Sequence, residues 1–342
     1  MIEPMGSVAN TPVMSRRMFA WITLVLFLAC CVAARLFISR TLDGTLCVGW
    51  NRDAAAWRWG AVHSAMCAGA ALALSGLLLQ SMLRNPLASP FVLGLSAGSQ
   101  AAVAIAYIIA FQAGAALAPS AQVPIGTLGA VVALLLCIAF GRSRERGLDP
   151  IGMVLAGVVV AAMAGSIAAL CEWLLPPTER MGLAAWSLGR IPEAPESLPL
   201  IACLVLLAVS LLFFQVQART LDAMQLSDDE ALSVGVNLRR MRWAIVIASS
   251  ALAAAATALC GPLAFVGLVA PHAARALFAG SHRSTLFASA IAGAALLVLA
   301  DATRTMIPVQ GGRLPIGVVC ALAGGPAFLV LLRRGAAGAW SR

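Results

Sequence analysis

The sequence predicts an all-α, polytopic membrane protein of about ten transmembrane helices. Hydrophobic residues make up 61% of the 342 residues and charged residues only 11%, whereas a soluble domain carries about 25% charged residues. Several apolar runs reach the roughly 20 residues that a helix needs to cross a bilayer. The period-two alternation typical of a membrane β-barrel is absent. Because backbone polar groups in hydrocarbon must be bonded internally, we expect the spans to be helices.

The boundaries of the spans follow from the residues that interrupt the apolar runs. Asn85-Pro86 ends the second span and Pro176-Pro177 ends the fifth, since proline lacks an N–H and cannot continue a helix. The polar segment 142–150 separates the fourth and fifth spans. The predicted spans are 18–38, 59–83, 93–111, 124–140, 151–175, 198–214, 243–260, 262–278, 286–305 and 314–332.

The first apolar run is predicted to be an uncleaved span. Arg16 and Arg17 precede it, as they would in a signal peptide, but the run from Met18 to Ala34 is longer than the usual apolar region of about 7–15 residues. We therefore divide the chain into an N-terminal tail (1–17), a transmembrane domain (18–333) and a C-terminal tail (334–342), with both tails expected in the cytoplasm.

Arginine placement predicts the orientation. With the N-terminus in the cytoplasm, 15 of the 23 arginines lie on the inner side and 8 on the outer side, as the positive-inside rule favours. Both termini are then cytoplasmic, and we expect the chain in a bacterial inner membrane. The tripeptide Pro-Leu-Ala follows the second and seventh spans, and Pro-Ile-Gly opens the fifth and tenth. Such an echo between oppositely directed spans suggests the inverted repeat of many transporters.

Residue usage excludes several chemistries. All 23 basic residues are arginine, so the chain cannot build a phosphate-binding P-loop, which needs lysine. If ATP drives this protein, another chain must bind it. The nine cysteines show no Cys-x-x-Cys or zinc spacing. We predict no metal site, no catalytic residue and no nucleic-acid partner, and a membrane-bound enzyme finds no support because no nucleophile–base pair is visible.

The longest loop on the predicted cytoplasmic side, residues 215–242, has the pattern of two short helices. Ser227 can cap a helix, with Glu230 as its capping-box partner three residues later. Gly235 can end that helix. An ordinary charged loop is the alternative, but the capping pattern favours order.

Few ionisable residues lie inside the spans. Glu172 and Asp301 fall near the outer ends, and His272 and Arg275 share a face of the eighth span. Intramembrane charges are functional candidates, although anchoring at the interface is the favoured explanation of the His272–Arg275 pair. A proton-coupled carrier would be expected to place a carboxylate near the midplane, and none is seen.

Three stretches resemble the iron-chelate and cobalamin permease family of ATP-binding-cassette importers, in the right order and spacing from about residue 58 to 333. The first is residues 69–76 with Gln80 and residues 85–90, the second runs from Gly261 to Asp301 through Phe265-Val266-Gly267-Leu268, and the third is residues 314–319 with Gly324 and Pro326. The resemblance implies ten spans per subunit and a permease dimer, most simply a homodimer. It also implies two ATPase subunits that bind ATP and Mg²⁺, and a periplasmic binding protein. This chain would hold no cofactor.

The resemblance also assigns site residues. Leu226, Asp228, Ala231 and Gly235, with Glu230 of the capping box, match the coupling element that fits into the ATPase, predicted at residues 219–241. Asn85, Pro86, Pro271, His272 and Arg275 match a motif on the cytoplasmic side. Arg58 matches an outer arginine that receives the binding protein. Arg190, Arg304 and Arg313 also fall on the outer side, where they could line the entrance or anchor at the interface.

Some positions depart from the family pattern. Ser227 replaces a usual glycine, Ala61 replaces a second docking arginine, and Arg313 replaces a glutamate. Ferric siderophore, haem and cobalamin all fit the family, and we rank them in that order as cargo. The alternative function is a proton-coupled secondary transporter that acts without an ATPase.

Overall fold

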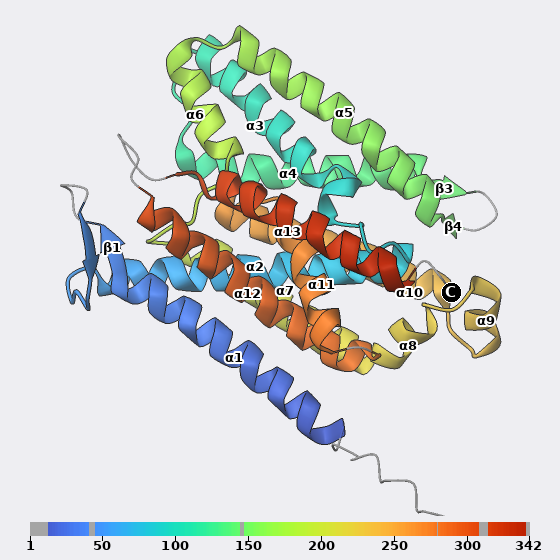
Figure 1. Cartoon of the computed structure of the whole chain (residues 1–342). Coiled ribbons are helices and arrows are strands. Elements are labelled where there is room, and N and C mark those ends of the chain that lie inside the picture. The colour runs from blue at the N-terminus through green and yellow to red at the C-terminus, as the bar shows by residue number, and fades with distance from the viewer. Residues whose placement is uncertain (1–12, 41–44, 144–146, 279, 308–313, 340–342) are drawn as a thin grey trace, which may run out of the picture.

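The computed structural model describes residues 13–40, 45–143, 147–278, 280–307 and 314–339. This part of the chain is almost entirely helical (Figure 1), which confirms the predicted fold class. The helices are α1 (Val13–Phe37), α2 (Ala55–Leu83), α3 (Leu95–Gln112), α4 (Pro119–Phe140), α5 (Pro150–Leu174), α6 (Pro177–Ser187), α7 (Ser197–Val216), α8 (Ala218–Ala223), α9 (Asp228–Ser233), α10 (Leu238–Cys260), α11 (Val266–Leu277), α12 (His282–Met306) and α13 (Ile316–Ala339), with a 3₁₀ turn η1 (Pro90–Leu93).

Eight of the described helices are long and apolar enough to span a membrane: α1 to α5, α7, α10 and α12. The chain is therefore an integral membrane protein. Helix α13 covers the tenth predicted span, with its apolar part at Ile316–Val330. Helices α1 and α13 extend into the segments predicted as tails, since α1 begins at Val13 and α13 continues to Ala339.

The prediction of the eighth span was wrong. Residues 262–278 do not form one crossing helix, because the helix there is α11, which has 12 residues and a length of about 18 Å, against the roughly 30 Å of the hydrocarbon core. Gly261 has a φ of +75° and Phe265 a φ of +66°, and Pro262 lies between them. The chain is therefore not helical between the end of α10 at Cys260 and the start of α11 at Val266.

Two short hairpins connect helices and were not predicted. Strands β1 (Ile38–Arg40) and β2 (Leu46–Val48) pair antiparallel between α1 and α2, with Ser39 opposite Cys47. Strands β3 (Arg142–Ser143) and β4 (Gly147–Leu148) pair between α4 and α5. Strands this short carry almost no periodic signal in the sequence.

Helix α2 is the central helix of the bundle. In its 18-residue apolar stretch 89% of the residues are buried, compared with 17% in α7. A Cβ added at Gly76 would lie 1.7 Å from the carbonyl oxygen of Gly267 in α11, and one at Gly69 would lie 2.3 Å from that of Gly293 in α12. The backbones of these helices thus touch, as small residues in membrane helices allow.

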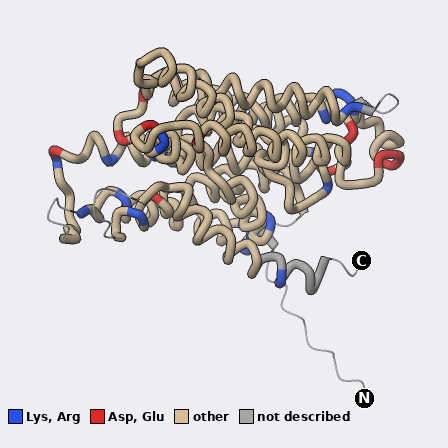
Figure 2. The backbone as a smooth tube through the Cα atoms, turned by 90° about the horizontal axis from the view of Figure 1, so that it is seen from above, with Lys and Arg blue, Asp and Glu red and all other residues tan. Residues whose placement is uncertain are grey.

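Charged residues gather at the two ends of the bundle and leave its middle almost uncharged (Figure 2). The β1–β2 hairpin and α6 lie at one end, and β3–β4, α8 and α9 lie at the other (Figure 1). These are the segments predicted outside and inside, respectively. Helices α2 and α10 run in opposite directions, as the inverted repeat requires, and the repeat itself stays a prediction.

Candidate functional site

The segment predicted to couple to an ATPase is ordered as two short helices, α8 and α9, and residues 218–237 are called the coupling segment from here on. The capping box is confirmed: the Glu230 backbone N–H donates to Ser227 Oγ at 3.3 Å, and the Ser227 N–H donates to Glu230 Oε2 at 2.9 Å. The Ser227 hydroxyl also donates to Glu230 Oε2 at 2.7 Å, and this bond, with that from the Ser227 N–H, lowers the pKa of Glu230. Gly235 ends the turn after α9 with a φ of +84°.

The predicted coupling residues divide into an outward and an inward set. Leu226 is 44% exposed, and the neighbouring Leu232 and Val234 are 55% and 63% exposed. Ala231 is fully buried and packs into the core instead. The coupling segment therefore presents apolar side chains beside acidic ones at one end of the bundle, a composition suited to a protein partner.

Asp228 joins the coupling segment to two other elements. Its Oδ1 accepts from Arg84 Nη2 at 2.8 Å, and its Oδ2 accepts from Arg242 Nη2 at 2.6 Å. Partial burial raises the pKa of Asp228, but the two guanidinium groups outweigh it and hold that pKa below its usual value of 3.8. Arg84 follows α2 directly, and Arg242 lies in the first turns of α10.

The cytoplasmic-side motif residues link α11 to its neighbours. Arg275 Nη1 donates to Gln80 Oε1 of α2 at 2.8 Å, and the His272 ring meets Phe328 of α13 edge-on at 5.4 Å. Interfacial anchoring, the explanation favoured for His272 and Arg275, did not predict these contacts within the protein. Pro271 is buried inside α11. Asn85 Oδ1 accepts from the Leu87 N–H at 2.9 Å and shapes the turn that contains Pro86.

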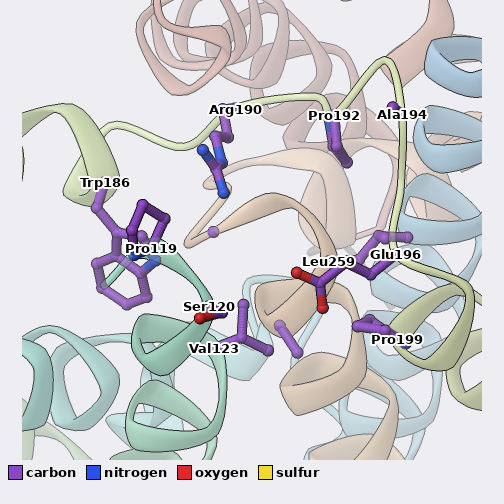
Figure 3. Close-up of a pocket in the computed structure, with 12 residues that line it drawn as sticks. Pro119, Ser120, Val123, Trp186, Arg190, Pro192, Ala194, Glu196, Pro199 and Leu259 are labelled. Carbon is purple, nitrogen blue, oxygen red and sulfur yellow. The ribbon is translucent and has the colours of Figure 1, made fainter. Parts of the chain in front are cut away.

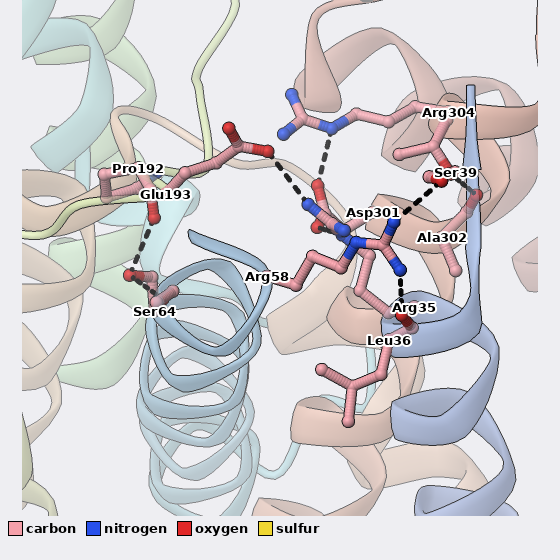
Figure 4. Close-up of polar contacts among 12 residues, drawn as sticks. Arg35, Leu36, Ser39, Arg58, Ser64, Pro192, Glu193, Asp301, Ala302 and Arg304 are labelled. Carbon is pink, nitrogen blue, oxygen red and sulfur yellow. Dashed lines mark hydrogen bonds and ion pairs between the residues drawn. The ribbon is translucent and has the colours of Figure 1, made fainter. Parts of the chain in front are cut away.

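At the opposite end, four charged side chains form a network that we call the outer cluster (Figure 4). Arg35 donates through Nε to Asp301 Oδ2 at 2.5 Å and through Nη2 to Glu193 Oε1 at 3.1 Å. Arg304 donates to the other Asp301 oxygen at 2.5 Å. Asp301 is completely buried and Arg35 is 2% exposed. Two cations and two anions thus balance inside the bundle.

Arg58 and Arg304 are not surface arginines, which differs from the expectation of an exposed entrance. Arg58 is 7% exposed and donates to the backbone carbonyls of Leu36 and Gly49 and to Ser39 Oγ (Figure 4). Its guanidinium therefore holds the β1–β2 hairpin against α1. Arg304 forms an ion pair with the buried Asp301. Arg313 lies outside the described residues, and the docking and entrance roles stay predictions.

Arg190 is exposed and lines a small cavity of about 110 Å³ between the start of α4, the loop after α6 and the end of α10 (Figure 3). Its backbone N–H donates to the Cys260 carbonyl at 2.8 Å, which fixes the loop. Trp186 forms one wall and Glu196 the opposite side. A basic and an acidic group thus face a shared hollow at the outer end.

The model of the FecCD transport family matches residues 22–334. The chain belongs to the FecCD transport family. Among its FecCD-type relatives is the hemin transport system permease protein HmuU of Yersinia pestis, at 33% identity over 271 residues that cover 79% of this chain and 80% of the relative. The ferric enterobactin transport system permease protein FepG of Escherichia coli is 36% identical and covers 81% of each chain. The vitamin B12 import system permease protein BtuC of Vibrio vulnificus is 36% identical, over 79% of this chain and 80% of that one.

A solved structure of a metal-chelate type ABC transporter in an inward-facing conformation has the same fold. It aligns with a TM-score of 0.78 and 24% identity, over 93% of this chain and 99% of that one. The family resemblance seen in the sequence is therefore confirmed by sequence relatives, and the fold by structure.

Sequence reasoning missed several residues of this FecCD-family chain. Arg35 was counted only for topology, although a charge in the last turn of an apolar span signals a buried partner. Asp301 and Arg304 were named separately, while their spacing of three residues places them on one helix face. Arg84 and Arg242 carried no local signal, because their contact with Asp228 depends on tertiary structure.

Proposed function

We propose that this FecCD-family chain is the transmembrane permease subunit of an ATP-driven importer. The observation that carries the proposal is the ordered coupling segment, which exposes Leu226, Leu232 and Val234 beside Asp228 and Glu230 at one end of a membrane bundle. The absence of lysine means that the chain has no P-loop, so a separate ATPase would bind ATP and Mg²⁺. This chain then acts as a transport subunit without enzymatic chemistry or a cofactor of its own.

The proposed assembly follows from the two ends of the bundle. Two permease subunits, most simply two copies of this chain, sit in a bacterial inner membrane with both termini in the cytoplasm. Two ATPase subunits contact the coupling segments, and a periplasmic binding protein docks on the outer end. Of the entrance candidates Arg58, Arg190 and Arg304, Arg190 is the exposed one, whereas Arg58 would act by holding the β1–β2 hairpin in place.

The cargo we propose is a ferric siderophore first, then haem, then cobalamin. Relatives named for ferric enterobactin, hemin and vitamin B12 support this class of large metal-containing molecules. Arg190 and Arg313 would add positive charge near the entrance and speed the encounter with an anionic chelate. On this hypothesis Arg190→Ala slows uptake of a carboxylate siderophore without weakening binding-protein docking.

The test compares two energy sources in sealed vesicles. Vesicles with the permease, the ATPase and the binding protein should take up ferric siderophore only when ATP is supplied to the ATPase side. Vesicles with the permease alone should take up none under an imposed proton gradient. Uptake by the permease alone, driven by that gradient, would establish the secondary-transporter alternative and refute the importer.

A further inference from the structure

The coupling segment is tied to the predicted cytoplasmic end of α2 through a hydrogen-bonded chain, which we call the first tie. Ser81 and His282 in this chain are buried, and the Asp222 side chain is 39% exposed. His282, the first residue of α12, lies between Asp222 of α8 and Ser81 of α2. His282 Nδ1 is 2.6 Å from Asp222 Oδ1, and Nε2 is 2.7 Å from Ser81 Oγ. The backbone N–H of His282 also donates to Asp222 Oδ1 at 2.9 Å. One Asp222 oxygen thus accepts hydrogen bonds from both the ring and the backbone N–H of His282.

The donors and acceptors of the first tie are matched. An ionised Asp222 can only accept, so Nδ1 of His282 carries a hydrogen. With the hydrogen on Nδ1, Nε2 of the neutral ring accepts, so Ser81 Oγ donates to Nε2 at 2.7 Å; the Leu77 carbonyl, 2.8 Å away, is the other acceptor within reach of the same hydroxyl. Gln225, at the end of the turn after α8, donates to the Ser81 carbonyl at 3.2 Å. The two sides of the coupling turn therefore both reach the same residue of α2.

The order Asp–His–Ser resembles that of a hydrolase triad, but the geometry points elsewhere. Ser81 is completely buried, and its hydroxyl lies between the His282 ring and the Leu77 carbonyl of its own helix. A nucleophile must reach its substrate, and this oxygen has no exposed surface. The chain of contacts therefore serves attachment rather than nucleophilic chemistry.

A second tie lies one helical turn further along α2. Arg84 pairs with Asp228 of α9 at 2.8 Å, and its Nε donates to the Met224 carbonyl at 2.7 Å. Arg242 of α10 holds the other oxygen of Asp228. Ser81 lies in the last turn of α2, and Arg84 is the residue that directly follows this helix. Helices α8 and α9 are thus attached separately to the same end of α2.

Helix α2 is suited to carry a displacement away from this end. Its backbone contacts α11 at Gly76 and α12 at Gly69, and closely packed interiors transmit strain. At its other end Ser64 Oγ donates to the Pro192 carbonyl at 3.1 Å, in the loop that borders the outer cavity. Moving the end of α2 would therefore move its packed neighbours and reach the outer loop.

From these contacts we propose that the two ties, Asp222–His282–Ser81 and Arg84–Asp228–Arg242, are positioning groups that make the coupling segment move together with α2. The transport consequence rests on the proposed function, in which an ATPase pushes on the coupling segment. Losing one tie leaves the other as an attachment. Losing both leaves only the Gln225–Ser81 and Arg84–Met224 hydrogen bonds and the packing of buried apolar side chains. The coupling segment then follows α2 less closely, so a push on it moves the bundle less.

The first experiment measures attachment in the chain alone. In full-length protein with its native cysteines replaced, spin labels are placed at Arg219→Cys on α8 and at Leu232→Cys on α9, both exposed positions. Asp222→Ala should mobilise the label at 219, Asp228→Ala the label at 232, and the double variant both. Asp229→Ala, a neighbouring exposed acid, is the matched control and should change neither. Labels that stay immobile in the double variant overturn the proposal.

The second experiment measures cargo transported per ATP hydrolysed, with the complete importer in vesicles. The double variant should keep ATP hydrolysis and lose this ratio by about fivefold or more, the lower range of couplings between sites. Asp222→Asn keeps an oxygen that accepts from His282 and should retain most of the ratio. A normal ratio in the double variant refutes the coupling role. A wild-type complex without ATP-dependent transport refutes the proposed function instead, and the label result still reports on the ties.

Discussion

Both ends of the bundle contain arginine–aspartate networks, but the two networks differ in how far their side chains are exposed to solvent. In the outer cluster Asp301 is completely buried, with Arg35 and Arg304 at 2% and 6% exposure. At the end that carries α8 and α9 the Asp228 side chain is 42% exposed and that of Arg84 is 35% exposed. Similar distances of 2.5 to 2.8 Å therefore describe interactions of different strength.

Burial decides what each network can do. Removing one partner of a buried ion pair leaves an uncompensated charge and costs about 3–5 kcal/mol, whereas an exposed pair is worth about 0–1 kcal/mol. The outer cluster is thus a permanent join among α1, α12 and the loop after α6. The Arg84–Asp228 pair at the other end contributes less to stability than the pairs of the outer cluster, so we expect it to hold the coupling segment in place rather than to stabilise the whole fold.

The largest effect should come from the outer cluster. Asp301→Ala leaves Arg35 and Arg304 buried without their shared anion, and we expect the free energy of unfolding to fall by about 3–5 kcal/mol. The measurement is thermal unfolding of the purified chain in detergent. Asp53→Ala, an exposed acid near the same end, is the control. A stability loss at Asp301 no larger than at Asp53 would mean that burial does not separate the two clusters.

The helix between the clusters gives the second prediction. Gly76→Ala would place a Cβ 1.7 Å from the Gly267 carbonyl oxygen, so α2 and α11 must separate, at about 1–3 kcal/mol of stability. Gly165→Ala in α5 meets nothing within 4 Å and is the matched control. For Gly76→Ala, the unfolding temperature in detergent and the uptake rate in vesicles should both decrease. For Gly165→Ala, both should match the unmodified chain. Equal behaviour of the two variants would argue against backbone contact at Gly76.

A smaller and local effect is expected at Gly235, which ends the turn after α9. Its φ of +84° suits glycine, and a side chain in the left-handed region costs roughly 1–2 kcal/mol. Gly235→Pro cannot adopt this φ at all. We expect reduced uptake with normal membrane insertion, measured as transport and as the amount of chain in the membrane. Normal uptake by Gly235→Pro would remove the coupling segment from the mechanism.

The smallest stability effect is expected at Asp228. Its pKa is lowered in the folded chain, so the pairs with Arg84 and Arg242 stabilise above the usual value of 3.8 and lose this contribution as pH falls through the depressed pKa. At neutral pH Asp228→Ala should lower the unfolding temperature less than Asp301→Ala. The Asp228 and Arg84 side chains are partly exposed, and Arg242 alone is left buried without its carboxylate. Uptake should nevertheless fall when Asp228 and Glu230 are reversed in charge together. A large loss of stability in Asp228→Ala would place this cluster in the same class as the outer one.

Features set by neighbouring residues could be predicted from the sequence. Features set by contacts between distant residues could not. The Ser227–Glu230 capping box and Gly235 predicted α9 because a helix end is decided by a few neighbouring residues. The short α11 was missed because an apolar count does not register the left-handed Phe265 or the non-helical Pro262. Arg35 and Asp301 are 266 residues apart in the sequence, so no local pattern joins them. Arg58 was assigned to the surface by analogy, and its burial follows from the unpredicted β1–β2 hairpin.

Labelling can determine which end of the bundle faces the cytoplasm. Single cysteines at Ser227 and Asn237, in a background without native cysteines, should react with a membrane-impermeant thiol reagent only from the cytoplasmic side. Labelling from the periplasmic side would exchange the roles of the two ends.

ATP hydrolysis by the complete complex tests the importer most directly. Vesicles would contain this chain and its ATPase, and binding protein would be added with or without ferric siderophore. The account predicts that the loaded binding protein stimulates ATP hydrolysis well above the rate seen without it, and that Arg190→Ala leaves the stimulation by saturating binding protein unchanged. An ATPase rate that is the same with and without loaded binding protein would contradict a permease that couples cargo on one end to ATP on the other.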